Sequence, residues 1–357
     1  MRSAKLLALA ATGFILAALP AQAQFEIASK DGKSSVKFGL LAQPQAEWID
    51  TATGDGTSQN LFVRRLRILM GGKIGEKLSF FVETDSPNLG KADATGKKNA
   101  DTIFMQDVIV TYTFSKGFML DTGMLLTPNS HNSEQGATTL LPIDYGPYSF
   151  VASTPTGSRV GRDYGMQARG YLASDHFEYR LGIFQGAREA GSQNAFRTIG
   201  RAVWYPFEAE TGFFYTGTNF GKKKILAIGA SYDQQDDYKA PAFDVYFDWP
   251  VGKNAVTAQV DLINYDGGTF LTTLPEQDTV HFEGGFFFSA AKLEPFFQYN
   301  TRNYADAAKA DETYSQVGLA YWHSNHNFNV KLGYGKFEKD NAKDQTQIVL
   351  QAQLFFY

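Results

Sequence analysis

The chain has 357 residues and a formal net charge of −4, with 33 Lys and Arg against 37 Asp and Glu. This balance argues against a globally basic nucleic-acid-binding protein, and no nucleic-acid partner is expected. The chain contains 30 Phe, 18 Tyr and 34 Gly but no Cys, so an exported form must be stable without disulfides.

The N-terminus has the features of a secretory signal peptide. Two basic residues precede an apolar run at positions 6–19, and Ala21-Gln22-Ala23 provides a small-x-small cleavage site. A transmembrane anchor is the alternative, but the run is short for a span. No later stretch contains 18 consecutive apolar residues, so no transmembrane helix is predicted beyond it. The sequence therefore predicts removal of residues 1–23 and one mature domain over residues 24–357.

The mature chain shows the two-residue period of β-strands. From residue 36 to 48 the even positions are almost all apolar, over a length closer to the 9–11 residues of a tilted membrane strand than to the usual ~5–6. Repetition of this pattern predicts an all-β protein, a transmembrane antiparallel β-barrel of about 16 strands, which is wide enough for an aqueous channel. The predicted strands cover residues 36–48, 62–74, 78–85, 108–114, 118–127, 164–172, 177–183, 198–205, 226–232, 243–249, 256–262, 280–288, 293–302, 314–322, 328–334 and 345–357.

The second of these stretches, residues 62–74, has one apolar and one cationic face. Its even positions from Leu66 onward are apolar, whereas Arg65 and Arg67 are odd. Charge on a lipid-facing surface near mid-membrane costs about 2–4 kcal/mol, so these arginines are expected to face an enclosed aqueous lumen. Arg64 has the apolar parity, so it must lie at the headgroup level or be turned inward by a β-bulge.

Residues 129–158 form the longest region without alternation. Three prolines and several aromatic residues favour an ordered loop over a disordered one. We expect this loop to fold into the barrel and constrict it.

Arg65, Arg67, Arg169 and Arg180 are the candidate pore-lining residues. Guanidinium groups bind phosphate, sulfate or carboxylate bidentately and stay charged, so they can raise the local anion concentration. The alternative is that acids on the same inner face, such as Glu83, Asp85 and Asp107, neutralise them and leave no net selectivity. The Lys222-Lys223-Lys224 run is interpreted as a solvated approach to a strand, with an anion funnel as the lesser alternative.

Several stretches together resemble the phosphate-selective porin O and P family of outer-membrane channels. They are Phe62-Val-Arg-Arg-Leu-Arg-Ile, Phe80-Phe-Val-Glu-Thr-Asp, Asp121-Thr-Gly-Met-Leu-Leu-Thr-Pro, Ser158-Arg-Val-Gly-Arg-Asp-Tyr-Gly-Met-Gln, Glu294-Pro-Phe-Phe-Gln-Tyr and Tyr314-Ser-Gln-Val-Gly-Leu-Ala-Tyr. The resemblance implies a homotrimer of 16-stranded barrels in the Gram-negative outer membrane, with inward-folded loops and an arginine-lined path to an anion site.

By position, Arg64 and Arg65 resemble the family's paired arginines near the constriction, which favours the bulged alternative for Arg64. The chain departs from the family pattern in two respects. Its inner face carries several acids, and Phe356 rather than Tyr357 has the register of the terminal aromatic assembly signal.

The expected function is passive diffusion of small hydrophilic solutes, with weak anion preference carried by Arg65 and Arg67. No enzyme activity, cofactor or metal is expected. A barrel hydrolase using His323, Ser324 and His326 is a minor alternative, because neighbours in one turn do not by themselves assemble a nucleophile, base and orienting acid. A barrel that sheathes a partner, such as an electron-carrying cytochrome, is a second alternative, and any haem would belong to that partner because the chain has no Cys-x-x-Cys-His motif.

Overall fold

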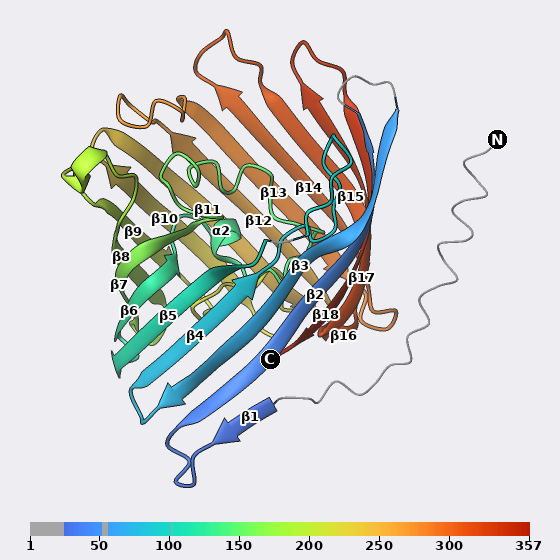
Figure 1. Ribbon diagram of the computed structural model, residues 1–357. Coiled ribbons are helices and arrows are strands. Elements are labelled where there is room, and N and C mark those ends of the chain that lie inside the picture. Colours follow the sequence, from blue (N-terminus) through green and yellow to red (C-terminus); the bar gives the residue numbers. More distant parts are fainter. Residues whose placement is uncertain (1–24, 52–55, 101) are drawn as a thin grey trace.

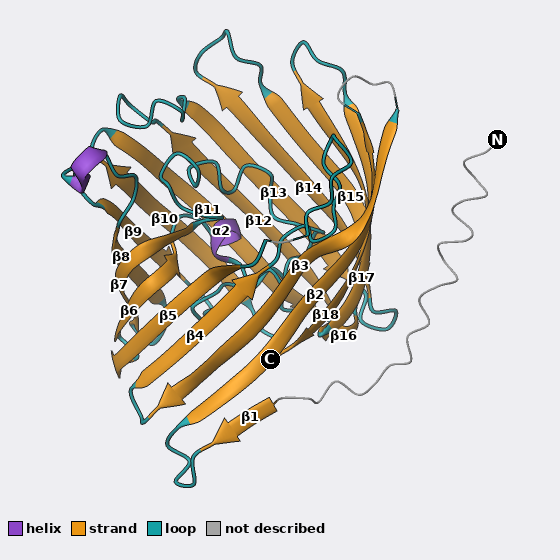
Figure 2. Ribbon diagram, in the orientation of Figure 1, coloured by secondary structure: helices purple, strands orange, loops and turns teal. Residues whose placement is uncertain are grey.

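The computed structural model describes residues 25–51, 56–100 and 102–357, and the predicted leader lies outside this part of the chain. Within the described residues, sixteen antiparallel strands form a closed barrel with almost no helix (Figures 1 and 2). The ring closes through the β18–β2 pair, and the predicted strand number is confirmed. The ring strands are β2 (Ser35–Asp50), β3 (Thr57–Ile74), β4 (Leu78–Asp85), β5 (Phe104–Ser115), β6 (Phe118–Leu126), β7 (Arg162–Leu172), β8 (Phe177–Phe184), β9 (Arg197–Trp204), β10 (Ile225–Gln235), β11 (Tyr238–Val251), β12 (Asn254–Tyr265), β13 (Gln277–Phe287), β14 (Leu293–Tyr304), β15 (Glu312–Tyr321), β17 (Phe328–Lys339) and β18 (Gln345–Phe356).

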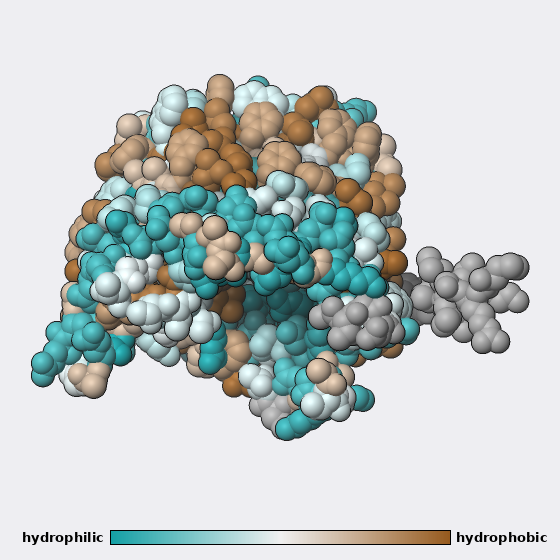
Figure 3. Space-filling view, turned by 90° about the horizontal axis from the view of Figure 1, so that it is seen from above, coloured by the Kyte–Doolittle hydropathy of each residue, from teal (hydrophilic) through white to brown (hydrophobic). Residues whose placement is uncertain are grey.

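Side chains alternate between the outer and inner faces of the wall, as the sequence pattern predicts. On β17, Leu332 and Tyr334 are about half exposed on the outside, whereas Asn329 and Lys331 are buried inside. Seen from above, the outer wall is rich in hydrophobic side chains and the loops around a hydrophilic hollow are polar (Figure 3). This is the surface that a barrel in a bilayer requires, because only the outer face contacts lipid.

The connections differ between the two ends of the barrel. At one end most are tight turns, such as residues 75–77, 116–117 and 252–253, while the other end carries long loops such as 86–103 and 127–161. The sequence pattern predicts this asymmetry, but two connections depart from it. Residues 236–237, which link β10 to β11 at the end with the long loops, form a tight turn. Residues 205–224, which link β9 to β10 at the end with the tight turns, form a long segment instead.

The loop at residues 127–161, which we call the constriction loop, folds into the lumen as predicted. It contains the short helix α2 (His131–Glu134), which lies inside the ring and contacts β11 and β12 (Figure 1). Leu140 packs with Leu41 and Leu69 of the wall, and Ile143 packs with a second wall cluster. The buried core of the protein therefore lies within the lumen, between the loop and the inner wall.

Two short strands complete the described structure. β1 (Phe25–Ala28) pairs with residues 35–38 of β2, on the edge of β2 that β18 covers from Leu40 onward. The second short strand is β16 (His323–His326), in the connection between β15 and β17. Because β18 ends at Phe356, β1 supplies backbone partners for the part of β2 that β18 does not reach.

The last two residues lie on opposite faces of the wall. Phe356 pairs with Leu40 on the outer parity, as the sequence predicts. The ring of Tyr357 lies inside, 5.7 Å from the ring of Phe81. It covers Gly39 and Gly71, where added methyl groups would overlap it, so these glycines make room for the terminal tyrosine.

No helix among the described residues is long and apolar enough to cross a membrane.

Candidate functional site

A β-bulge in β3 sets the direction of Arg64 and Arg65. Leu66 pairs with Ala42 and Val63 with Pro44, so the two arginines lie opposite the single residue Gln43. A bulge of this kind reverses the alternation of the strand, which turns both guanidinium groups to the same side. Of the two positions predicted for Arg64, the structure shows the one in which a β-bulge turns the side chain inward. The side chains of Arg64 and Arg65 both point into the lumen.

Both arginines bind Asp144 of the constriction loop. Arg64 Nε lies 2.8 Å and Arg65 Nη2 lies 2.5 Å from its two carboxylate oxygens, and the backbone N–H of Tyr145 donates a third bond at 2.9 Å. Burial raises the pKa of the Asp144 carboxyl, but the charges of Arg64 and Arg65 outweigh burial and hold this pKa well below its usual range. The loop is therefore fixed to the β3 wall by an ionised carboxylate.

Arg67 lies further down the same inner face and is paired with two acids. Its Nη1 donates to Glu83 at 2.7 Å and its Nη2 donates to Asp85 at 3.0 Å, and all three side chains are almost fully buried. Arg67 thus binds two of the three acids that the sequence identified as possible neutralising partners. The positive charge of Arg67 is therefore neutralised by these two carboxylates.

Arg169 and Arg180, the other predicted pore-lining residues, also lie inside and are paired. Arg169 Nε donates to Asp121 at 2.7 Å. Arg180 donates to Glu178 at 2.7 Å and to Glu134 of α2 at 2.5 Å. The structure therefore brings Arg64 and Arg65 together at one carboxylate, whereas Arg169 and Arg180 lie on the neighbouring strands β7 and β8 with partners of their own.

The inward arginines that were not among the predicted site residues include Arg162, Arg197 and Arg201. Each forms a two-pronged pair with one carboxylate, a geometry that favours Arg over Lys. The pairs are Arg162 with Asp107 (3.2 and 3.2 Å), Arg197 with Asp233 (2.8 and 2.6 Å) and Arg201 with Asp244 (2.5 and 2.8 Å). Alternation around Arg162 could have identified the first, but residues 198–205 alternate too weakly to show which way Arg201 faces.

The wall formed by β11 to β14 carries acids without such cationic pairs. Among the described residues, Asp248, Asp261 and Glu294 have no Arg or Lys nitrogen within 4 Å. They accept bonds from neutral groups instead, for example Glu294 from the indole N–H of Trp322 at 2.7 Å. Arginines on β3 to β9 therefore face an acidic wall.

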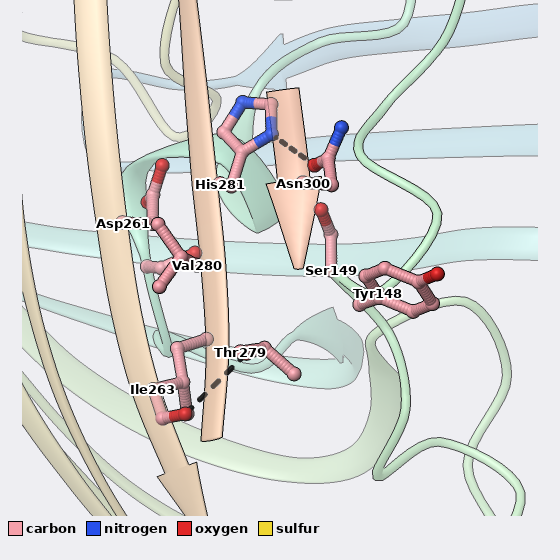
Figure 4. A pocket seen from close by; sticks show the side chains of 9 residues that line it. Tyr148, Ser149, Asp261, Ile263, Thr279, Val280, His281 and Asn300 are labelled. Carbon is pink, nitrogen blue, oxygen red and sulfur yellow. Dashed lines mark hydrogen bonds between the residues drawn. The ribbon is translucent and has the colours of Figure 1, made fainter. Parts of the chain in front are cut away.

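A small pocket separates the constriction loop from this acidic wall (Figure 4). Ser149 of the loop and Asp261, His281 and Asn300 of β12 to β14 line it, and His281 Nδ1 lies 2.7 Å from the side-chain oxygen of Asn300. The loop thus packs closely against polar groups of the wall.

The constriction loop is also tied to β14, β17 and β18, the strands that continue the ring on the other side of β2. Lys331 on β17 donates to the carbonyl oxygens of Leu140 at 2.5 Å and Pro142 at 2.8 Å. Gln353 on β18 donates to Thr138 O at 2.9 Å, and Gln298 on β14 donates to Asp144 O at 3.1 Å. Because the loop contacts strands all around the ring, it crosses the lumen rather than lining one wall.

The histidine turn does not assemble a catalytic triad. Ser324 Oγ lies 2.9 Å from His323 Nδ1, but no carboxylate among the described residues hydrogen-bonds that histidine. His326 is half-buried and packs against the rings of Phe220 and Trp322. The turn therefore lacks the orienting acid that nucleophilic catalysis of this type uses.

A closed 16-stranded barrel with an apolar outer face, a charged inner face and an inserted loop defines an outer-membrane channel of the porin type. The model of the phosphate-selective porin O and P family matches residues 43–239, more than half of the chain, and the chain belongs to this family. It is an outer-membrane channel for small solutes, and family and fold together indicate a channel rather than an enzyme.

Solved structures with the same fold are distant in sequence. The anion-selective porin from Comamonas acidovorans is 12% identical, with a TM-score of 0.62, covering 90% of this chain and 100% of that chain. OmpF of Salmonella typhi, in complex with daunomycin, is 15% identical (TM-score 0.59; 92% and 100% covered). OmpT of Vibrio cholerae in its trimer form is 11% identical (TM-score 0.55; 90% and 99% covered). Comparison with curated protein sequences gives no significant match.

Proposed function

We propose that the channel carries small hydrophilic solutes with a weak preference for anions, and that Arg64, Arg65, Arg67, Arg169 and Arg180 are the residues that attract them. The observation that carries this proposal is the exposure and the hydrogen bonding of the Arg64 side chain. Its side chain is 26% exposed, and its Nε alone is hydrogen-bonded to a described residue, namely Asp144. Its two terminal nitrogens can therefore donate to a passing anion beside the constriction loop.

The preference is weak because the other arginines are already paired. Arg67, Arg169 and Arg180 each bind at least one buried carboxylate, so each pair contributes little net charge to the lumen. Acids on the opposite wall further reduce the cationic field. A strong phosphate selectivity would require guanidinium groups free of protein carboxylates.

The test is the zero-current potential of the channel in a planar bilayer under a KCl gradient. Replacing Arg65 and Arg67 by Ala leaves Asp144, Glu83 and Asp85 with less neutralising charge, so the potential should shift toward potassium preference. The variant K97A/K98A removes the same charge from an exposed loop and should leave the potential unchanged. Potassium preference in the wild type, or an unchanged potential in R65A/R67A, would refute the assignment.

We further propose that the mature protein begins at residue 24 and assembles as a homotrimer in contact with outer-membrane lipid. Support comes from the leader-like N-terminus and from the trimer form of OmpT of Vibrio cholerae, a protein of similar fold. N-terminal sequencing and light scattering of the protein in detergent test both points.

A partner enclosed in the barrel would have to displace the constriction loop, so a diffusion channel is the function that the geometry favours over a sheath.

A further inference from the structure

The connection between β9 and β10, residues 205–224, is folded into the barrel from the end that carries the tight turns. We call it the turn-side segment. Tyr205, Glu210, Tyr215 and Thr218 are all at most 5% exposed, which is unusual for a connection at the mouth of a barrel. Backbone polar groups that are buried in this way need partners inside the lumen.

The turn-side segment finds these partners on the constriction loop. Tyr215 N donates to Glu134 O at 3.0 Å and Gly136 N donates to Tyr215 O at 2.9 Å, which forms a one-residue parallel bridge centred on Gln135. Thr218 N donates to Thr139 O at 3.1 Å. The two segments thus add a strand-like contact in the middle of the lumen, although they enter from opposite ends of the barrel.

Side chains reinforce this contact on the loop side. His131 Nε2 lies 2.8 Å from Glu210 Oε2, and the imidazole ring stacks between Tyr215 and Tyr246 with centroid distances of 4.9 and 4.0 Å. Thr139 Oγ1 accepts from Gly217 N at 3.0 Å. His131, Glu210 and the ring of Tyr215 therefore join the two segments beyond their backbone bonds, and Tyr246 of β11 supports the other face of the imidazole.

The wall holds the turn-side segment in place from behind. Arg180 on β8 donates to the carbonyl oxygens of Phe213 at 2.8 Å and Gly212 at 3.2 Å. Asp248 on β11 accepts from the backbone N–H groups of Asn219 and Gly221 at 2.8 and 2.9 Å. The segment is thereby fixed to the wall that lies away from Lys331 and Arg65, the residues that hold the constriction loop.

We propose that the turn-side segment is the second half of the constriction, so that the contact between residues 134–139 and residues 215–218 sets the upper size limit for solutes. The constriction loop is held by β3 and β17 and reaches β11 and β12 through α2. The turn-side segment is held by β8 and β11 and packs against the loop at this contact. A solute passes where these two segments part, and the strength of their contact determines how wide the passage becomes.

Glycine positions in the contact allow a matched test. A methyl group on Gly217 would overlap the carbonyl oxygen of Thr139 and lie 2.7 Å from the Cα of Leu140, so the backbones must separate. A methyl group on Gly136 would meet nothing nearer than 3.8 Å, and neither glycine has a positive φ. G217A therefore forces the segments apart, whereas G136A makes the same chemical change in the same contact without a clash.

The measurements are single-channel conductance and the size cut-off for neutral sugars in liposome swelling. G217A should raise both severalfold, and G136A should match the wild type. An unchanged cut-off in a G217A protein that migrates as a folded barrel on unheated gels would overturn the proposal.

A cross-link provides a second test that does not depend on the folding of G217A. Because the chain has no Cys, Q135C/Y215C introduces a single pair at the bridged position. The oxidised channel should conduct less than the same channel after reduction. Equal conductance in the two states would show that solutes do not pass by separating these segments, and the proposal would fail.

Discussion

Replacing Asp144 by Asn should make the channel more anion-selective. The carboxylate binds both Arg64 and Arg65, and its side chain is 32% exposed toward the solvent of the lumen. Asparagine keeps the shape and one acceptor oxygen but removes the negative charge. The positive charges of Arg64 and Arg65 would then no longer be partly neutralised by Asp144, so they would attract passing anions more strongly.

The size of the shift follows from Coulomb's law. For an ion that passes about 8 Å from position 144, one unit charge changes its energy by about 0.5 kcal/mol in water. The change has opposite sign for Cl⁻ and K⁺, so the permeability ratio should shift by about fivefold at low salt. At physiological ionic strength the Debye length is about 8 Å, which reduces the expected shift to about twofold.

The assay is the zero-current potential under KCl gradients of low and high mean concentration. D340N removes one acid from an exposed loop at the same end of the barrel and should change the potential little. A shift of D144N toward potassium, or a shift that does not weaken with salt, would refute the inference that Asp144 masks the arginine charges.

Two other predictions concern pH and the glycines beneath the C-terminus. Burial raises the Asp144 pKa but the two arginines outweigh it and keep it well below that of an unfolded carboxyl. This stabilisation is therefore present above about pH 4 and lost only as pH falls through the lower folded-state value, so the difference in zero-current potential between D144N and the wild type should be the same at pH 7 and at about pH 4.5. A methyl group on Gly72 would overlap a backbone carbonyl of β2, whereas one on Gly71 would meet the movable ring of Tyr357. G72A should therefore give less folded barrel than G71A on heat-modifiability gels, and equal yields would contradict the steric argument.

The sequence predicts the barrel well because alternation is a property of each strand taken alone. Lipid on one side and polar groups on the other impose it on every strand, so the sixteen strands and the inward direction of Arg65, Arg67, Arg169 and Arg180 could be predicted without tertiary information. The constriction loop could be located for the complementary reason, since it is long, aromatic and without alternation.

The remaining features depend on contacts between distant residues. Arg64 faces inward because β3 gains a residue opposite Gln43, and only the pairing of two strands defines a bulge. The turn-side segment has no periodic pattern, and its burial depends on partners such as Glu134 that lie about eighty positions earlier in the chain. The pairing of each arginine with a particular acid likewise depends on strand register, which composition does not determine.

The contacts inside the lumen couple the stability of the wall to that of the inserted segments. Arg65 on β3, Lys331 on β17 and Glu210 in the turn-side segment all bind the same loop, although they are widely separated along the chain. Neither half of the sheet alone provides all the hydrogen-bond and ion-pair partners of the loop, and an unpaired buried charge costs several kcal/mol. A ring in which β18 paired with β2 while either segment lay outside the lumen would lack these contacts, so the closed barrel should be most stable when both segments are inside it.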